Sequence, residues 1–262
     1  MTSAPTSILD ASNLPALAGS LLERLRAERI RVHAITNAAA QTFTANLLLA
    51  AGGIPSLTVA PEEVPAFTSR SAALLVNLGT LDSDRRAAVP EAIATARTNA
   101  KPWVFDPVFV EASPTRLDFA RVCLAGKPHV LRCNAKEFTA LAGDEPTPGS
   151  IQAFAKDHGT VVALTGVVDL ISDGNNVLCV ENGHPLMTRV TAMGCAGTAL
   201  VAAFAALHGS AIEAAAAALL VTGVAGEIAA NEANGPGTFQ PAFLDALFHL
   251  DSATLVTCGR VS

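Results

Sequence analysis

Short apolar segments rich in β-branched residues alternate with longer helical segments over residues 32–165. This alternation is typical of a sheet whose strands are joined by crossover helices. Most of the short segments are apolar throughout, which favours strands covered by helices on both faces and therefore a mainly parallel sheet. The sequence predicts an α/β fold, with strands at residues 32–36, 56–59, 73–77, 103–106, 130–132 and 161–165.

Glycine and asparagine mark the ends of other predicted elements. Residues 41–51 have a helical pattern that stops at Gly52 and Gly53, which can take the left-handed conformation of a helix end. Residues 170–180 are interrupted by Gly174-Asn175-Asn176, a triplet that tolerates positive φ, and they predict a β-hairpin. The block at 144–150 is rich in Pro and Gly and is expected to be a loop.

The last third of the chain differs in character, because residues 195–230 are Ala-rich and helical in pattern. Their most apolar run, 214–225, is shorter than the roughly twenty residues needed to cross a bilayer, and Glu213 and Glu227 flank it. Two closely packed core helices are therefore predicted, with no membrane span. Residues 241–250 predict a last amphipathic helical segment.

Length and charge exclude several classes of protein. The chain has 262 residues, 50% of them apolar, and can bury one large core. It contains no internal repeat or long polar linker, so we expect a single domain over residues 1–262, with residues 1–12 as a flexible lead-in. The net charge is −6 and no run of Lys or Arg exceeds two residues, so nucleic acid is not an expected partner.

The start of the chain and its cysteines indicate the compartment. Residues 1–10 lack the basic patch and apolar stretch of a secretory signal. The five cysteines are odd in number and form no CxxC pair. A reducing cytoplasm is therefore the expected location.

Polar residues end most of the predicted strands. In an open α/β sheet, ligands bind beyond the carboxyl ends of the strands, so these residues are candidates for a site. A Thr or Asn in such a place is also a common cap of the next helix, and either role is open for each residue alone. The strand-end residues are Thr36, Asn37, Asn77, Asp106, Arg132, Asn134 and Thr165.

A second candidate lies where residues 191–198 lead into a helix. Ala192, Gly194 and Gly197 are small, so backbone N–H groups here can approach an anion. The start of a helix concentrates unpaired N–H donors, which is what a transferring phosphoryl group requires. A glycine-rich helix start is also a common packing device, so the pattern alone does not decide.

Nine ordered segments carry a resemblance to a known family. They are VHAITN at 32–37, QTFTAN at 41–46, PEEV at 61–64, NLGT at 77–80, FDPV at 105–108, RCNAKE at 132–137, TG at 165–166, GC at 194–195 and NGPGTF at 234–239. In this order they resemble the signature segments of hydroxyethylthiazole kinases, over about residues 30–250. Several ordered segments are far more specific than one motif.

The resemblance implies a fold, a reaction and an assembly. It implies a ribokinase-like three-layer α/β fold, with a mainly parallel central sheet covered by helices on both faces. The implied reaction is the transfer of phosphate from ATP to 4-methyl-5-(2-hydroxyethyl)thiazole, in thiamin salvage, with Mg²⁺. The implied assembly is a homotrimer whose active sites lie between neighbouring subunits.

The resemblance also assigns roles to single residues. Asp106 and Glu137 match acidic positions that serve magnesium, whose preferred ligands are hard oxygens. Arg132, Thr165 and Asn37 match positions that contact ATP, and an Arg presents a planar fork of donors to phosphate. The matched substrate-binding positions are Leu57, Gly79 and Gly194, and the matched anion hole is Ala192, Met193, Gly194 and Cys195.

Cys195 occupies the position where related sugar kinases have an Asp general base. A helix start lowers the pKa of a thiol, so we expect a thiolate that can accept the proton of the alcohol. Phosphoryl transfer through a loose transition state depends mainly on positioning and charge neutralisation, so this base is expected to contribute less than the metal site.

The sequence departs from the family pattern beside the site. Met193 replaces a common Thr, Cys133 replaces a common Gly, and Phe109 and Glu111 stand where the family often has small residues. Another acceptor alcohol therefore remains an alternative, with a kinase or ATP-dependent dehydratase acting on another small metabolite. Further alternatives are a Cys hydrolase that pairs Cys195 with His33 or His184, and a binding protein that has lost activity.

Overall fold

The structure is a computed structural model that describes residues 11–262. Within these residues one sheet of eight strands has the order β2-β1-β3-β4-β5-β6-β7-β8. Neighbouring strands from β2 to β6 are parallel, and β7 and β8 are added antiparallel at one edge. The strands are β1 (Arg31–Ile35), β2 (Ile54–Ser56), β3 (Ala73–Asn77), β4 (Trp103–Asp106), β5 (Val130–Asn134), β6 (Val161–Thr165), β7 (Asp169–Ser172) and β8 (Val177–Val180).

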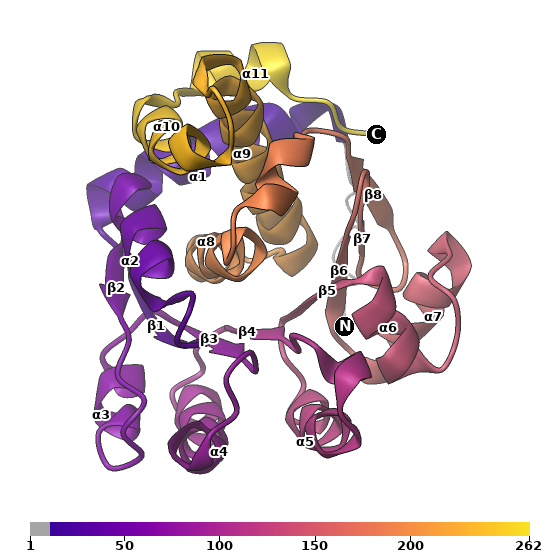
Figure 1. Ribbon diagram of the computed structural model, residues 1–262. Coiled ribbons are helices and arrows are strands. Elements are labelled where there is room, and N and C mark those ends of the chain that lie inside the picture. Colours follow the sequence, from indigo (N-terminus) through magenta and orange to yellow (C-terminus); the bar gives the residue numbers. More distant parts are fainter. Residues whose placement is uncertain (1–10) are drawn as a thin grey trace, which may run out of the picture.

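Helices cover both faces of the sheet, in three layers (Figure 1). One layer contains α3 (Val64–Ser69), α4 (Ser83–Thr98), α5 (Pro114–Ala125), α6 (Ala135–Ala142) and α7 (Pro148–His158). The opposite layer contains α1 (Leu14–Glu28), α2 (Gln41–Ala50), α8 (Met193–Leu207), α9 (Ala211–Glu232), α10 (Pro236–His249) and α11 (Ser252–Cys258). Short 3₁₀ turns lie at η1 (Ala11–Asn13), η2 (Val110–Ala112) and η3 (Pro185–Arg189).

The two layers explain why the strands are apolar throughout. Every residue of β3 is buried, and its side chains alternate between two cores. Ala73 and Leu75 belong to the core under α1, α2 and α8–α11, whereas Leu74 and Val76 belong to the core under α3–α7. A strand that is covered on both faces leaves only its ends for polar side chains. The mainly parallel three-layer α/β fold is confirmed.

Helix α9 is long and apolar enough to cross a membrane, but 78% of its most apolar window is buried inside the structure. It packs against α8 and α10, so the two Ala-rich core helices are confirmed. Ala218 and Leu220 are fully buried, as expected for a core helix. Small side chains on α8 and α9 let the two helices lie close together.

The sequence-based boundaries are correct for β3, β4 and β6 and differ by one or two residues for β1 and β5. Four larger differences occur elsewhere. Strand β2 ends at Ser56 because only Ile54, Pro55 and Ser56 pair with β1, so residues 57–59 lie outside the sheet. The expected loop at 144–150 ends early, because Thr147 caps α7 by accepting a hydrogen bond from the Ser150 N–H.

The other two differences concern the ends of the chain. The segment expected at 241–250 is the larger part of α10, and α11 follows it, capped by Asp251. Of the expected lead-in at 1–12, residues 1–10 lie outside the described residues, and Ala11–Asn13 form a 3₁₀ turn that continues into α1.

Candidate active site

Polar ends of neighbouring parallel strands meet at one edge of the sheet. Asn77 and Asp106 are register partners at the ends of β3 and β4. Asn134 and Thr165 are register partners at the ends of β5 and β6. Helix α8 packs over β1, β3 and β4, and its first turns contact this edge. The strand-end residues and the glycine-rich helix start therefore form one site.

A chain of hydrogen bonds crosses three strand ends. Asn77 donates from Nδ2 to Asp106 Oδ2 over 2.8 Å. Its Oδ1 accepts from Asn37 Nδ2 at 3.1 Å and from the Gly79 N–H at 3.0 Å. Asn37 Nδ2 also lies 3.3 Å from Cys195 Sγ. The amides of Asn77 and Asn37 thus connect the acidic centre to the cysteine.

Asp106 is fully buried and only one of its oxygens is hydrogen-bonded. Oδ2 accepts from Asn77 and from Thr198 Oγ1, the latter at 3.1 Å, whereas Oδ1 has no partner among the described residues. Burial raises the pKa of this carboxyl, and the nearby positive charge of Arg132 opposes the rise. A buried carboxylate with a free oxygen suits a cation or its water shell.

Glu137 is the second buried carboxyl of the site. It forms a capping box with Asn134 at the start of α6, in which Oε2 accepts from the Asn134 N–H at 2.9 Å. Oε1 accepts from the Phe109 N–H at 3.1 Å. Burial and then the charge of Asp106 raise the pKa of Glu137. A buried carboxyl whose pKa is raised further by a neighbouring acidic group favours a positively charged partner.

Phe109 has φ 59°, in the left-handed region that suits glycine. This explains why a Gly suits the position after Asp-Pro-Val. The conformation aims the Phe109 N–H at Glu137 and leaves the ring 60% exposed. The departure from the family pattern therefore changes the surface beside the site and keeps the hydrogen bond.

Arg132 lies beneath the start of α8. A Cβ on Gly194 would stand 2.7 Å from Arg132 Nη2, so only glycine allows the guanidinium to lie against the helix start. Burial acts to lower the pKa of Arg132, but the charges of Asp106 and Glu137 outweigh it and the pKa is raised. Arg132 therefore stays positively charged beside the donors of α8.

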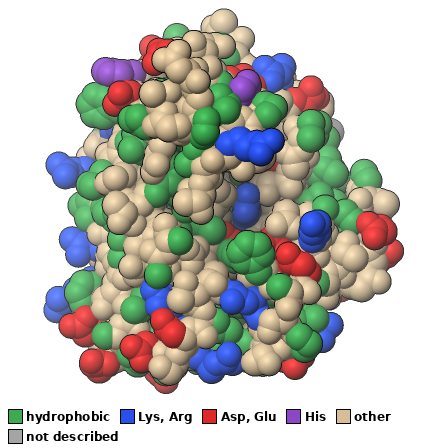
Figure 2. All heavy atoms as spheres, in the orientation of Figure 1, with side chains coloured by type: hydrophobic (Ala, Val, Ile, Leu, Met, Phe, Trp, Pro, Cys, Tyr) green, Lys and Arg blue, Asp and Glu red, His purple; other side chains and the backbone are tan. Residues whose placement is uncertain are grey.

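A cavity of about 590 Å³ opens beside Arg132. Residues of β5, β6, η3, α8 and α9 line it, among them Arg132, Thr165, Gly194, Met187 and Leu219. Its walls are mostly apolar away from Arg132, as in pockets that hold a flat ring system with a charged group at one end. Figure 2 shows basic and acidic side chains within and beside a hollow near the centre of this face, in the region that Figure 1 assigns to α8, β5 and β6.

Asp169 is a titratable group of the cavity that sequence reasoning missed. It accepts from the Gly166 N–H at 2.9 Å. Burial raises the pKa of Asp169 to about 6. The signal available in the sequence is an acidic residue at the start of a predicted hairpin, directly after Thr165-Gly166.

The sequence also did not reveal the bridging role of one candidate residue or the membership of another residue in the site. Asn77 was predicted as a strand end, without a role as the bridge between Asn37 and Asp106. Thr198 lies one turn after Cys195 on α8, and its hydroxyl lies 3.1 Å from Asp106 Oδ2. A polar residue one turn into an apolar helix is the signal that could have found it.

The N-terminal turn of α8 has the form of an anion site. Ala192 caps it with φ 67°, and Met193, Gly194 and Cys195 are the first helical residues. Met193 is buried against the core and lines the cavity, so the departure from Thr fills space at the cavity wall. The first N–H groups of a helix have no partner within the helix, and this turn lies at the edge of the sheet where Thr198 contacts Asp106.

The expected thiolate of Cys195 is wrong. Burial, followed by the negative charge of Asp106, raises the pKa of the Cys195 thiol to about 11, despite hydrogen bonds from Asn77 and Asn37. Cys195 is therefore a neutral thiol near pH 7. The helix start favours the thiolate, but removal from water outweighs this effect.

Of the remaining predicted residues, Thr165 lines the cavity, whereas Gly79 and Leu57 lie outside its lining. Gly79 packs on Asn37, since a Cβ would come within 2.5 Å of Asn37 Cβ. Leu57 is half-buried just after edge strand β2, so it is not a strand residue as the sequence predicted. Thr165 ends β6 and lines the cavity, with Oγ1 3.4 Å from the Cys133 carbonyl.

The two histidines considered as partners of Cys195 are engaged elsewhere. His33 Nδ1 is 3.0 Å from Ser56 Oγ, and burial lowers the pKa of His33 to about 4. His184 Nδ1 accepts from the Leu186 N–H at 3.2 Å. A hydrolase needs a base within hydrogen-bond reach of the thiol, and the side chains that contact the Cys195 thiol are the amides of Asn37 and Asn77, which are not bases.

The fold and the site together define a ribokinase-like small-molecule kinase. Solved structures with low sequence identity share the fold, among them a ribokinase-like superfamily protein from Enterococcus faecalis (14% identical, TM-score 0.64, covering 94% of this chain and 91% of that one). A pyridoxal kinase from Staphylococcus aureus matches less of the chain (16% identical, TM-score 0.61, covering 76% and 88%).

The family follows from closer relatives. The model of the hydroxyethylthiazole kinase family matches residues 22–253. The chain is 44% identical to the "Probable hydroxyethylthiazole kinase" of Agrobacterium fabrum, with 94% of this chain and 95% of that protein covered. It is 35% identical to the solved hydroxyethylthiazole kinase protein of Pyrococcus horikoshii OT3, with TM-score 0.89 and 94% and 98% covered. The chain belongs to the hydroxyethylthiazole kinase family.

Proposed function

We propose that this protein transfers the γ-phosphate of ATP to the hydroxyl of 4-methyl-5-(2-hydroxyethyl)thiazole, as a step of thiamin salvage. The observation that carries the proposal is the hydrogen-bonded line that runs from Cys195, in the first turn of α8, through Asn37 and Asn77 to Asp106 at the end of β4. This line joins the place where an alcohol can be held to the place where charge develops. Family membership supplies the identity of the alcohol.

ATP fits the cavity beside Arg132. The apolar walls around Met187 and Leu219 suit the base, and Thr165 and Arg132 lie toward the strand ends, where the phosphates would run. Arg132 offers a planar fork of donors to the phosphates. The free N–H groups of Met193, Gly194 and Cys195 then receive the charge of the transferring group. Asn37 holds its amide between Cys195 and Asn77, next to that group.

Asp106 and Glu137 would hold Mg²⁺. Asp106 has a free buried oxygen, and the raised pKa of both carboxyls indicates that their negative charges lack compensation. Both oxygens of Glu137 already accept backbone N–H groups, so Asp106 is the better direct ligand and Glu137 acts through water or charge. Magnesium supplies neutralisation of phosphate charge.

The acceptor alcohol would lie between Cys195, Gly79 and Leu57. The neutral thiol of Cys195 orients the hydroxyl. The proton of the hydroxyl leaves late and goes to an oxygen of the transferred phosphoryl group as the new O–P bond forms and the bond to ADP breaks, because a loose transition state needs little deprotonation of the nucleophile. Gly79 lets the Asn37 side chain lie directly against its backbone, and Leu57 offers an apolar contact to a thiazole ring.

We also propose a homotrimer in the cytoplasm, with each site completed by a neighbouring subunit. Leu57 lies at the edge of the sheet, where part of its side chain faces outward. Exposed apolar side chains lie on nearby elements, with Leu49 on α2 55% exposed and Phe67 on α3 38% exposed. Light scattering coupled to gel filtration tests the trimer, and a monomer at assay concentration would contradict it.

A coupled assay of ADP release tests the reaction. The thiazole alcohol should give the highest kcat/KM in a panel of small hydroxymethyl and hydroxyethyl heterocycles. A better turnover of another alcohol, or ADP release with a dehydrated product, would favour a relative in the same superfamily. Calorimetry of thiazole binding with and without Mg-nucleotide separates a kinase from an inactive binding protein.

Cys195→Ala and Cys195→Asp test the thiol. We expect Cys195→Ala to keep a measurable part of kcat, because positioning carries most of the rate. Full turnover of Cys195→Ala together with loss of activity in Cys195→Asp would exclude a role for the thiol in proton transfer.

A further inference from the structure

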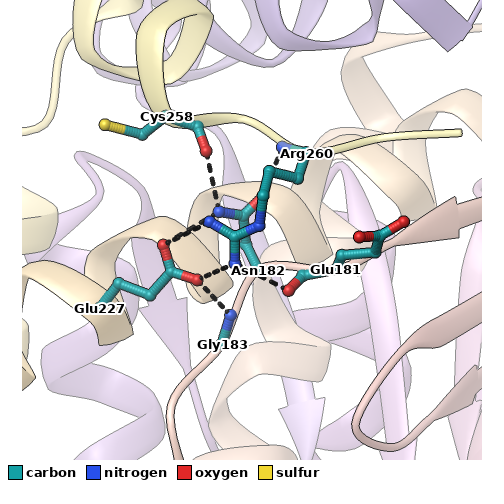
Figure 3. Close-up of polar contacts among 6 residues, drawn as sticks. All are labelled: Glu181, Asn182, Gly183, Glu227, Cys258 and Arg260. Carbon is teal, nitrogen blue, oxygen red and sulfur yellow. Dashed lines mark hydrogen bonds and ion pairs between the residues drawn. The ribbon is translucent and has the colours of Figure 1, made fainter.

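One wall of the nucleotide cavity is held by residues that are far apart in the sequence. Asn182 and Gly183 line the cavity just before η3. Figure 3 shows Glu227 of α9, the Cys258 carbonyl at the end of α11 and Arg260 of the following segment gathered around these two residues.

The Asn182 amide is almost fully used by this contact. Its Oδ1 accepts from the Arg260 N–H at 2.7 Å, and Nδ2 donates to Glu227 Oε2 at 3.0 Å and to the Cys258 carbonyl at 2.9 Å. Both N–H groups of the amide already donate hydrogen bonds, so the side chain cannot also recognise the base of a nucleotide by donating to it. Asn182 is 5% exposed, and its role is to fix the backbone of the wall.

Glu227 and Arg260 complete the contact. Arg260 donates from Nη2 to Glu227 Oε1 at 2.5 Å and from Nη1 to Oε2 at 3.3 Å, which makes a two-pronged ion pair. Glu227 Oε1 also accepts from the Gly183 N–H at 2.9 Å. Arg260 Nη2 reaches the Glu181 carbonyl at 2.9 Å. One ion pair therefore touches the backbone on both sides of Asn182.

Residues 260–262 run beside β8 like a short further strand. The Glu181 N–H donates to the Arg260 carbonyl at 3.0 Å, and Cys179 and Ser262 exchange two backbone hydrogen bonds of 2.7 and 3.1 Å. This pairing fixes the position of the Arg260 backbone along β8, and with it the point from which the Arg260 side chain reaches Glu227.

Two glycines of α9 let the wall lie directly on the helix. A Cβ on Gly223 would stand 2.5 Å from the Asn182 carbonyl oxygen, and a Cβ on Gly226 would stand 2.5 Å from Met187 Sδ. Leu219 and Thr222 of the same helix face the cavity. The spacing between wall and helix thus decides how wide the cavity is.

We propose that Arg260 and Glu227 are positioning residues for the nucleotide, because they hold the Asn182–Gly183 wall against α9. This inference rests on the proposed use of the cavity for ATP. The side chain of Arg260 is 51% exposed and that of Glu227 is 24% exposed. An ion pair this exposed adds little to global stability, so its loss moves the wall before it unfolds the protein.

The test uses Arg260→Ala, Arg260→Lys and Glu227→Gln. For Arg260→Ala we expect KM for ATP to rise roughly three- to tenfold, with kcat within about twofold and KM for the acceptor unchanged. Arg260→Lys should have a KM for ATP between those of wild type and Arg260→Ala, because Lys keeps the positive charge but loses the two-pronged guanidinium contact. The double variant Arg260→Ala with Glu227→Gln should raise KM for ATP little more than either single variant, since each single change already breaks the same ion pair. The matched control is Arg121→Ala, which removes the exposed 3.7 Å pair with Asp118 on α5, away from the cavity.

Direct binding of ATP, measured by calorimetry without acceptor, separates a failure of this inference from a failure of the proposed function. If wild type binds ATP but does not phosphorylate the thiazole alcohol, the proposed function fails, and the ratio of ATP affinities of wild type and Arg260→Ala still tests the inference. An unchanged KM and affinity for ATP in Arg260→Ala overturns the inference. A large fall in Tm together with equal rises in KM for ATP and for the acceptor also overturns the inference, because that result indicates a general structural role.

Discussion

Asn77 and Asp106 are register partners at the ends of β3 and β4, and their side chains are joined by a hydrogen bond of 2.8 Å. The sheet therefore sets the direction of the Asp106 carboxylate. The same Asn77 accepts from Asn37, which contacts Cys195. One amide links the proposed metal side of the site to the proposed acceptor side, which makes it a sensitive position for mutation.

Asn77→Ala should lower kcat on the order of ten- to a hundredfold, because Asp106 loses its donor and Asn37 loses its acceptor. The free energy of unfolding should fall by about 1 to 3 kcal/mol, since buried polar groups are left unpaired. Steady-state kinetics and urea unfolding measure both effects. Asn99→Ala is the control, because the Asn99 side chain donates to the Thr95 carbonyl at the exposed end of α4, away from the site. Unchanged kcat in Asn77→Ala would show that Asp106 does not depend on this bond.

Gly194→Ala should raise KM for ATP at least about tenfold, because the new methyl group meets Arg132 at 2.7 Å and displaces the guanidinium from the helix start. The measurement is ATP titration at saturating acceptor. Gly209→Ala is the matched control, since a Cβ at Gly209 meets no atom within 4 Å. If both variants behave alike, the close approach of Arg132 to Gly194 has no part in ATP binding.

Much of this site could be predicted from the sequence. Apolar strands that end in Asn77, Asp106 and Thr165 specify a shared edge, because parallel strands place their carboxyl ends together. The family assignment made from nine motifs is confirmed. What the sequence could not supply is contact between distant side chains, such as Thr198 with Asp106 or Arg260 with Glu227.

The protonation state of Cys195 also could not be predicted from the sequence, for a physical reason. The helix start is visible in the sequence and favours a thiolate, whereas the burial that opposes it depends on what α8 packs against. The edge strand β2 is a similar case, because its length depends on how many residues can pair with β1.

The raised pKa of Cys195 predicts slow alkylation. With a pKa of about 11, on the order of 0.1% of the thiol is ionised at pH 8, and the labelling rate should rise about tenfold for each pH unit up to 10. Peptide mass spectrometry after iodoacetamide treatment measures the rate at Cys195, with glutathione as the free-thiol reference and circular dichroism as the check on folding. A rate that levels off below pH 8 would mean that the thiolate is stabilised after all.

The raised pKa of Asp169 predicts that the stability of the protein depends on pH. Its pKa is raised by burial from 3.8 to about 6, so between these values the folded protein binds a proton that the unfolded chain releases. Asp169 therefore reduces stability progressively as pH rises from about 4 to 6, and the loss is complete above that range. Asp169→Asn should be more stable than wild type at pH 7 to 8, by at most about 3 kcal/mol, and this advantage should disappear near pH 4.

Asp173→Asn is the control of opposite sign in the same hairpin. Burial acts to raise the pKa of Asp173, but hydrogen bonds from the Asn176 and Asn175 N–H groups outweigh it, so the pKa is lowered. A carboxyl of this kind stabilises the fold at neutral pH and loses that effect as pH falls below about 4, so Asp173→Asn should be less stable than wild type at pH 7. Thermal unfolding of the three proteins from pH 4 to 8 measures the two slopes. If Asp169→Asn is less stable than wild type at pH 7, the Asp169 carboxylate is held by more favourable contacts than the Gly166 N–H and the charge of Arg132 provide.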